Sequence, residues 1–145
     1  MPKSTNTSNN FLALLYNATP WANIADNAAG SPISTIYIAL ATASYTVAST
    51  MSTAEATYTN YLRVTTNRAT GASGWTAPAS RATQNVSQIT FAQCGASGNT
   101  ITSACTGKAA GASDIFHYGD LNSPIAVSNL IQPIFAAGAV TITEA

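Results

Sequence analysis

The side chains able to do chemistry in this chain are few and lie far apart. The chain has one histidine, His117, and two cysteines, Cys94 and Cys105. A protein metal site needs three or four ligands, and only His117 is available to join the two thiols. His117 lies between Phe116 and Tyr118, where a lone histidine is more often a packed or hydrogen-bonded structural residue than a base. We therefore expect no metal ion and no catalytic histidine.

Patterns typical of hydrolases and nucleotide-binding proteins are also missing from the sequence. No Gly-x-Ser-x-Gly elbow presents a nucleophile on a strained turn. Asp114 and Asp120 lie on one predicted strand, which holds their carboxylates about 20 Å apart, whereas a glycosidase pair works at roughly 5 to 10 Å. The glycine-containing segments 71–74 and 107–111 lack the spacing that cradles phosphate. The chain is therefore predicted not to be an enzyme and to need no cofactor.

The cysteines and the amino terminus bear on the compartment. Cys94 and Cys105 flank a segment rich in glycine, serine and threonine, residues 95–104. A disulfide across a hairpin is one alternative, and two small buried thiols are the commoner outcome in a reducing compartment. The first residues lack the apolar core and cleavage site of a signal peptide. We expect the protein to be made in a cytoplasm, which favours free thiols but leaves the pairing open.

The composition describes a surface with very little charge. Only 7% of residues are charged, with five Lys/Arg against five Asp/Glu, whereas an average globular protein has roughly a quarter. Such a surface suits permanent contact with neighbouring subunits. The basic residues are scattered, which argues against nucleic acid as a partner. No apolar run approaches the roughly 20 residues that span a bilayer, which argues against a membrane.

Short segments of alternating or aromatic character predict an all-β protein. The clearest is 35–42, which is β-branched, apolar on both sides and too short for a helix. The other predicted strands cover residues 58–66, 86–91, 99–106, 114–121 and two segments within 131–143. About seven strands are typical of a sandwich. We predict a single domain over residues 1–145 with a β-sandwich or jelly-roll-like fold.

The two ends of the chain carry the remaining predicted elements. Apolar residues between Phe11 and Tyr16 recur at helical spacing, Ser8 to Asn10 offer N-cap side chains, and Pro20 stops the helix. A short helix is predicted there, preceded by a flexible arm over residues 1–8. Near the other end, Phe135 and Ile142 are predicted to face inward on two strands joined by a kink at Gly138.

Large aromatic side chains in predicted loops are the candidate contact residues. Trp21 and Trp75 each lie in a loop near a proline. The favoured interpretation is that each ring packs against one end of the sandwich, and the alternative is that it anchors a neighbouring subunit. Tyr58 lies at the start of a predicted strand, after a long connection rich in alanine, serine and threonine, and joins Trp21 and Trp75 as a candidate interface residue.

A series of short motifs runs through most of the chain. They are a leucine-rich opening at 10–15, Tyr-Ile-Ala-Leu at 37–40, Glu55 followed by Tyr61-Leu62-Arg63-Val64, Ile-Thr-Phe at 89–91, Tyr-Gly-Asp-Leu at 118–121, and Phe-Ala-Ala-Gly-Ala-Val-Thr-Ile-Thr at 135–143. This order resembles a family of small tailed-phage virion proteins commonly labelled tail fibre proteins, whose members include proteins that decorate the capsid. Two segments depart from the family pattern. A Trp-Gly strand is missing from 95–111, and Ser128-Asn129-Leu130-Ile131 stands where the family tends to have Asn-x-Gly-Asp.

The resemblance implies a structural protein of a virion, assembled in the host cytoplasm and without catalytic residues. The favoured hypothesis is a capsid cement protein, a dimer or trimer that binds and stabilises the shell of the major capsid protein. The alternative is a tail or tail-fibre component that trimerises and contacts a host receptor, with Tyr58 or Trp75 stacking on sugars. Copy number per particle distinguishes the two.

Overall fold

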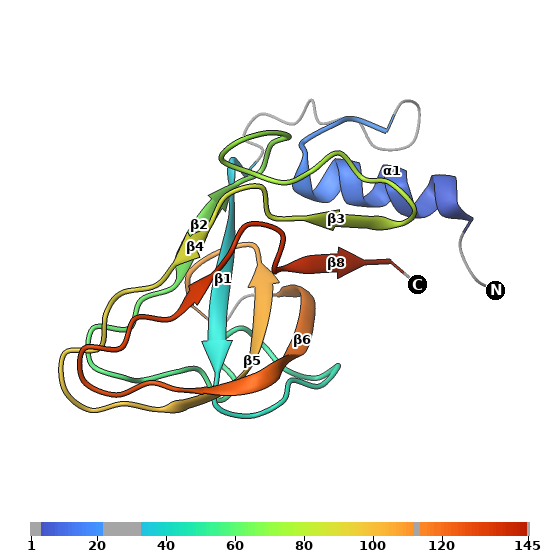
Figure 1. Cartoon of the computed structure of the whole chain (residues 1–145). Coiled ribbons are helices and arrows are strands. Elements are labelled where there is room, and N and C mark those ends of the chain that lie inside the picture. Colours follow the sequence, from blue (N-terminus) through green and yellow to red (C-terminus); the bar gives the residue numbers. More distant parts are fainter. Residues whose placement is uncertain (1–3, 22–32, 112–113, 145) are drawn as a thin grey trace. The chain divides into compact units, whose positions relative to one another are not determined.

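The structure, a computed structural model, describes residues 4–21, 33–111 and 114–144. The elements in chain order are α1 (Thr5–Tyr16), β1 (Thr35–Ala41), β2 (Val64–Asn67), β3 (Ala82–Gln84), β4 (Ile89–Thr90), β5 (Thr100–Gly107), β6 (Ile115–Ala126), β7 (Ile134–Phe135) and β8 (Thr141–Thr143) (Figure 1). Most of the loop that follows Trp21 lies outside the described residues. Within them, no helix is long and apolar enough to cross a membrane.

The strands form antiparallel sheets of unequal size. The largest has four strands in the order β2-β1-β5-β6, and two smaller sheets pair β3 with β8 and β4 with β7. The prediction of an all-β, sandwich-like fold with a short amino-terminal helix is confirmed. The finer jelly-roll connectivity stays a prediction.

The described residues group into two compact units. Unit 1 comprises Met1–Thr35, Thr66–Ile89 and Phe135–Ala145, and unit 2 comprises Ile36–Thr65 and Thr90–Ile134. Unit 1 contains α1 and the β3–β8 pair, and unit 2 contains β5, β6 and most of β1. Each unit is assembled from separate stretches of the sequence. The prediction of a single domain is not tested by this division.

The amino-terminal helix begins earlier than expected. Ser4 is the N-cap, its side chain accepting a hydrogen bond from the Thr7 backbone N–H, and the helix runs from Thr5. A serine in extended backbone just before a helix is a good cap, and it lies upstream of the caps that the apolar spacing indicated. The prediction of a flexible arm over residues 1–8 is therefore wrong for residues 5–8, which are helical. Residues 1–3 lie outside the description.

Strand lengths differ most from prediction where a turn or a side chain interrupts the backbone hydrogen bonds between strands. The segment predicted as a strand over 58–66 is a strand only from Val64, because a turn with a Tyr61 N–H to Tyr58 carbonyl bond and Asn60 at φ 75° precedes it. The segment 86–91 is a strand only over β4, because the Ser87 carbonyl accepts a hydrogen bond from the Asn85 side chain and not from a neighbouring strand. β3 was not predicted at all.

β1 and β5 form the centre of the four-stranded sheet. Their antiparallel register pairs Ile38 with Thr106 and Leu40 with Ala104. Ile38 and Leu40 on one face of β1 and Ala39 and Ala41 on the other are all buried, which confirms the prediction of a central strand covered on both faces. The strand predicted over 99–106 is confirmed as β5, which is eight residues long and pairs on both sides, with β1 and with β6.

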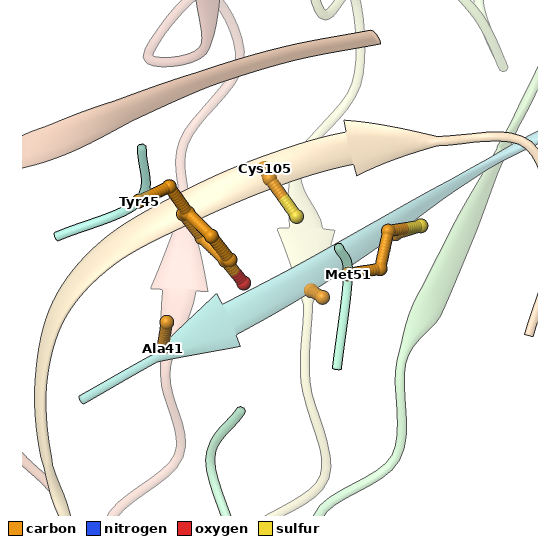
Figure 2. Packing of buried hydrophobic residues seen from close by; sticks show 5 residues of the cluster. Ala41, Tyr45, Met51 and Cys105 are labelled. Carbon is orange, nitrogen blue, oxygen red and sulfur yellow. The ribbon is translucent and has the colours of Figure 1, made fainter. Parts of the chain in front are cut away.

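One face of this sheet is covered by the long connection after β1. Tyr45 and Met51 from that connection pack on Ala39, Ala41 and Cys105, and all five residues are buried (Figure 2). The figure shows the Tyr45 ring and the Met51 side chain lying over β1 with the Cys105 sulfur between them. The long connection rich in alanine, serine and threonine is thus fixed in unit 2 by two apolar side chains, Tyr45 and Met51.

The carboxy-terminal strand completes the small sheet of unit 1. β3 and β8 pair antiparallel with Thr83 opposite Ile142, and both of these side chains are buried. The turn before β8 has Gly138 at φ 76°, which confirms the predicted kink. Ile142 faces inward as predicted. Phe135 is half-buried, so it is less enclosed than Ile142.

Candidate interaction surface

Trp75 is a core residue of unit 1. Its ring is fully buried, and its indole Nε1–H donates to Thr66 Oγ1 at 3.1 Å. The Tyr16 ring meets it edge-on, with ring centroids 4.7 Å apart. Aromatic pairs of this geometry contribute beyond their buried area. The burial favours the interpretation that Trp75 packs within its own chain rather than anchoring a neighbouring subunit.

Tyr58 is similarly enclosed in unit 2. Its hydroxyl donates to the Ala92 carbonyl at 3.1 Å, and its ring lies edge-on to the Tyr61 ring at 5.2 Å. Burial raises the pKa of Tyr58 to about 12. The buried ring has no face left for stacking on a sugar. Trp21, the third candidate, is half-buried at the boundary of the described residues, and its role as a contact residue stays a prediction.

The Glu55 and Tyr-x-Arg motif is a polar latch in unit 2. Arg63 Nε donates to Glu55 Oε1 at 2.6 Å and Nη2 donates to Glu55 Oε2 at 2.7 Å. The Tyr61 hydroxyl donates to the same carboxylate at 3.1 Å and accepts from the Leu40 backbone N–H of β1 at 3.0 Å. The bond to Glu55 is the largest cause that raises the pKa of Arg63. These side chains bind one another, so the latch holds the fold together.

Two more arginines are bound within unit 1. The buried Arg68 donates to the carbonyls of Leu14, Leu15 and Ile33 at 2.5, 2.8 and 3.1 Å. The first two carbonyls lie in the last turn of α1, which has no basic residue of its own, so Arg68 supplies the positive charge that a helix carboxyl end favours. Burial lowers the pKa of Arg68. Arg81 Nε donates to the Glu144 backbone carbonyl at 2.9 Å.

The groups able to bind metals or act as nucleophiles are dispersed. Among residues 4–21, 33–111 and 114–144, no three His, Cys, Asp or Glu side chains come together as a metal site would require. Cys94 and Cys105 are both free and buried, and burial raises the pKa of the Cys105 thiol. His117 pairs with Thr106 across β5 and β6 and is half-buried.

Exposed apolar side chains gather on adjoining segments of unit 2. Residues 58–62, 91–97 and 128–134 lie side by side, because Gly95 N–H bonds the Thr59 carbonyl and Cys94 N–H bonds the Ile131 carbonyl. We call them the three-segment surface; in Figure 1 they are the green, yellow and orange-red stretches of unit 2. Its exposed large apolar side chains are Leu62, Leu130, Ile131 and Ile134. None of the three segments contains Asp, Glu, Lys or Arg.

Leu130 is the most unusual residue of this surface. It has φ 67°, a left-handed conformation that glycine and asparagine adopt easily and a branched side chain resists. Its side chain is 67% exposed. The backbone is fixed on both sides, since Leu130 N–H donates to the Cys94 carbonyl at 2.8 Å and Leu130 O accepts from Gln93 Nε2 at 2.9 Å. Sequence reasoning missed this residue as a candidate.

Comparison with known proteins places the chain in one family. The model of a family described as podophage GP4 fiber I protein gp80 matches residues 4–143. No curated protein matches the chain. The match confirms the resemblance to small tailed-phage virion proteins labelled tail fibre proteins, and it assigns the chain a structural role in a phage virion. Since the match extends over almost the whole described length, the chain belongs to the podophage GP4 fiber I protein gp80 family.

Proposed function

We propose that this chain is a subunit of a phage tail fibre that assembles with further copies of itself through an uncharged surface. The family description names a fiber protein, and that description supports the fibre over the capsid cement that the sequence favoured. The proposal assigns no catalytic role to the chain. Its partners are other virion subunits, and neither nucleic acid nor a membrane is among them.

The observation that carries the proposal is that arginine side chains bind groups within their own chain. The guanidinium groups of Arg63, Arg68 and Arg81 each bind a carboxylate or carbonyl of the same chain. Few charges are then left to face a partner in a chain that has only 7% charged residues. Contacts that depend on neutral polar and apolar groups suit permanent assembly, in which no long-range attraction to a free ligand is needed.

The second candidate function is the capsid cement protein that binds the major capsid protein. The same uncharged surface favours it, because a cement also makes permanent contacts that are repeated over the shell. The receptor-binding role of the fibre alternative has less support, since Tyr58 and Trp75 are buried.

A reconstruction of the intact virion by electron microscopy tests the proposal. A fibre subunit is expected at the tail in a small number of copies that follows the tail symmetry. A copy number approaching that of the capsid subunits, with density on the shell, would establish the cement instead. Absence of the protein from purified particles, measured by quantitative mass spectrometry, would overturn both.

A further inference from the structure

The outer strand of the four-stranded sheet, β6, has one free edge. It pairs with β5 on one side, and among the described residues no strand pairs with its other side (Figure 1). In an antiparallel ladder the N–H and C=O groups of alternate residues point away from the neighbouring strand. Within the part of the chain that the structure describes, Tyr118, Gly119 and Asp120 make no main-chain hydrogen bond outside the pairing with β5. This edge of β6 therefore carries backbone donors and acceptors that the described chain does not use.

Only one half of the free edge is protected against strand pairing. Natural proteins blunt exposed edges with prolines, bulges and charged side chains. Between Asp120 and Ile125 the register against β5 shifts, and Pro124 in that stretch has no N–H to donate. From His117 to Asp120, by contrast, β6 pairs with β5 residue for residue. This regular half has no proline, and its one carboxylate lies at its end.

The chemistry of the edge indicates what kind of group can cover it. None of the twelve residues of β6 is buried, and a Cβ atom on Gly119 would meet nothing within 4 Å, so a partner can approach the strand closely. Backbone groups that alternate between donor and acceptor are matched by another extended backbone, which adds to the sheet as a further strand. A sugar or a helix has no such alternating row. The occupant of this edge is therefore a β-strand.

Charge and irregular pairing exclude most ways of joining two copies of β6. Two copies related by a two-fold axis pair antiparallel about a central residue that lies opposite itself. A centre at His117 sets Asp114 of each copy opposite Asp120 of the other, and a centre at Asp120 sets that residue opposite itself. Like charges directly opposite each other are destabilising. A centre at Gly119 extends the pairing to Leu121, in the stretch where the register shifts.

The register centred on Tyr118 avoids both problems. Tyr118, 45% exposed, then lies opposite the same residue of the second copy, and aromatic cross-strand pairs stabilise sheets. His117 lies opposite Gly119, which leaves space for its ring, and Asp120 lies opposite the uncharged Phe116. We propose that a second copy of this chain pairs with the free edge of β6 in this register and joins two four-stranded sheets into one. This inference rests on the proposed function, since it names the contact by which fibre subunits meet.

Disulfide trapping tests the pairing on the purified full chain and on assembled virions. Two cysteines can be bridged only when their Cα atoms lie within about 7 Å, and residues opposite each other in an antiparallel ladder meet this condition. Tyr118→Cys should therefore form a covalent dimer under mild oxidation, measured on non-reducing gels. Cys94 and Cys105 are buried, so the wild type should form none.

Asn122→Cys is the matched control. Asn122 is exposed on the same strand but lies in the stretch where the register shifts, and the proposed register does not set it opposite itself. Tyr118→Cys should give about tenfold more dimer or better, because thiols held opposite each other react at a high effective concentration. Equal yields from the two variants would overturn the proposal.

A mixture of two further variants tests the register and does not depend on the Tyr118 ring, which lies 6.1 Å from the Tyr45 ring. Phe116→Cys mixed with Asp120→Cys should give a covalent heterodimer, whereas neither variant alone should give a comparable yield of homodimer. A mixture that forms no more dimer than its separate components would overturn the register and the proposal with it.

Failure of this contact is distinguishable from failure of the proposed function. Virions that carry the protein at the tail but give no cross-link would overturn the pairing of two copies and leave the fibre role standing. If the β6 amides of such virions are nonetheless protected from hydrogen exchange, a strand of another subunit covers the edge. The expected cross-links support the contact whichever virion location the reconstruction finds.

Discussion

Arg63 and Glu55 are joined by two hydrogen bonds, from Nε to Oε1 at 2.6 Å and from Nη2 to Oε2 at 2.7 Å. Their side chains are 8% and 20% exposed. The Arg63 Nη1 atom also donates to the carbonyls of Ala109 and Gly111, at 3.0 and 2.6 Å. One guanidinium therefore fastens the connection after β1 and the loop after β5 to the start of β2, and two loops of unit 2 depend on it.

Replacing Arg63 by methionine should lower the free energy of unfolding by about 3 kcal/mol. The substitution leaves the Glu55 carboxylate without its positively charged partner, with only the Tyr61 hydroxyl still donating to it, and takes the Arg63 donor from two carbonyls. Removal of one partner from a buried pair costs about 3 to 5 kcal/mol. The exposed part of Glu55 places the expectation at the lower end. Urea unfolding curves measure the change.

The control for this substitution is Lys108→Met, which removes a positive charge from an exposed position in the loop that Arg63 fastens. It should change stability by no more than about 0.5 kcal/mol. An Arg63→Met variant as stable as Lys108→Met would show that the latch contributes nothing to the fold.

The latch also shows how far the sequence could predict the structure. Glu55, Tyr61 and Arg63 were recognised as parts of one family motif, but nothing in their spacing indicated that the three side chains meet. Their contact depends on the turn at Asn60, which carries φ 75°. A turn inside a segment that alternates like a strand is not visible in the alternation itself, so the strand was predicted too long.

Strands were predicted correctly where the residue types of one short segment determine them. Prediction failed where a strand is determined by pairing with segments distant in the sequence. β1 could be predicted because its residues are apolar on both sides. β3 could not, since it is set by pairing with β8, whereas the strand predicted over 99–106 matches β5 to within one residue at each end. The sequence indicated aromatic side chains as the candidate contact residues, and the structure shows that two of them, Tyr58 and Trp75, are buried. Leu130 was noted only as a departure from a glycine-containing family pattern, and its φ explains why glycine suits that place.

Removal of the hydroxyls of Tyr61, which is half-buried, and of Tyr45, which is buried, should have different consequences for stability. The Tyr61 hydroxyl accepts from the Leu40 N–H and donates to Glu55, so Tyr61→Phe should cost about 1 to 3 kcal/mol. The Tyr45 Oη atom has no hydrogen-bond partner among the described residues, and the Cys105 thiol in the same cluster is a weak donor and acceptor. Tyr45→Phe should be neutral or stabilise by up to about 1 kcal/mol.

Thermal melts of the two tyrosine variants check this pair of expectations. The two substitutions remove the same atom from tyrosine rings of unit 2, so each serves as the control for the other. Equal destabilisation by both would mean that the Tyr45 hydroxyl is as well satisfied as that of Tyr61.

A glycine in β5 is required by the packing of the connection after β1. A Cβ atom on Gly107 would overlap the Met51 sulfur and lie 2.7 Å from the Asp114 carbonyl oxygen. Gly107→Ala should therefore displace Met51 from its cluster and cost about 1 to 3 kcal/mol, as overpacking commonly does.

Gly119→Ala in β6 is the matched control, because a Cβ there meets nothing within 4 Å. Neither glycine has a positive φ, so the two substitutions differ in packing alone. The Gly107→Ala variant should have a clearly lower denaturant midpoint than Gly119→Ala. Equal midpoints would show that the Met51 side chain can move aside without loss of stability.

Association of the protein with the virion should depend weakly on salt. Contacts between uncharged groups lack the long-range term that salt screens, so particles moved from about 0.05 to 1 M salt should keep the protein. Sedimentation of the particles followed by quantitation of the bound protein measures this. Release at moderate salt would assign the contact to the few charged side chains, among which Lys108 is exposed.

Stability should decline at alkaline pH because buried phenols resist ionisation. Burial raises the pKa of Tyr58 to about 12 from an ordinary value of 10.0, and burial also raises the pKa of Tyr61. The folded state then holds protons that the unfolded chain releases, so the contribution is complete below about pH 10 and is lost as the pH rises from about 10 toward 12. Urea midpoints should fall over this range and change little between about pH 7 and 9.

The Tyr58→Phe variant is the control, because it removes one of the groups whose pKa is raised. It should make the decline with pH shallower, even though it lowers stability at neutral pH through loss of the hydrogen bond to the Ala92 carbonyl. A wild-type midpoint that stays constant up to about pH 12 would contradict the enclosure of these rings.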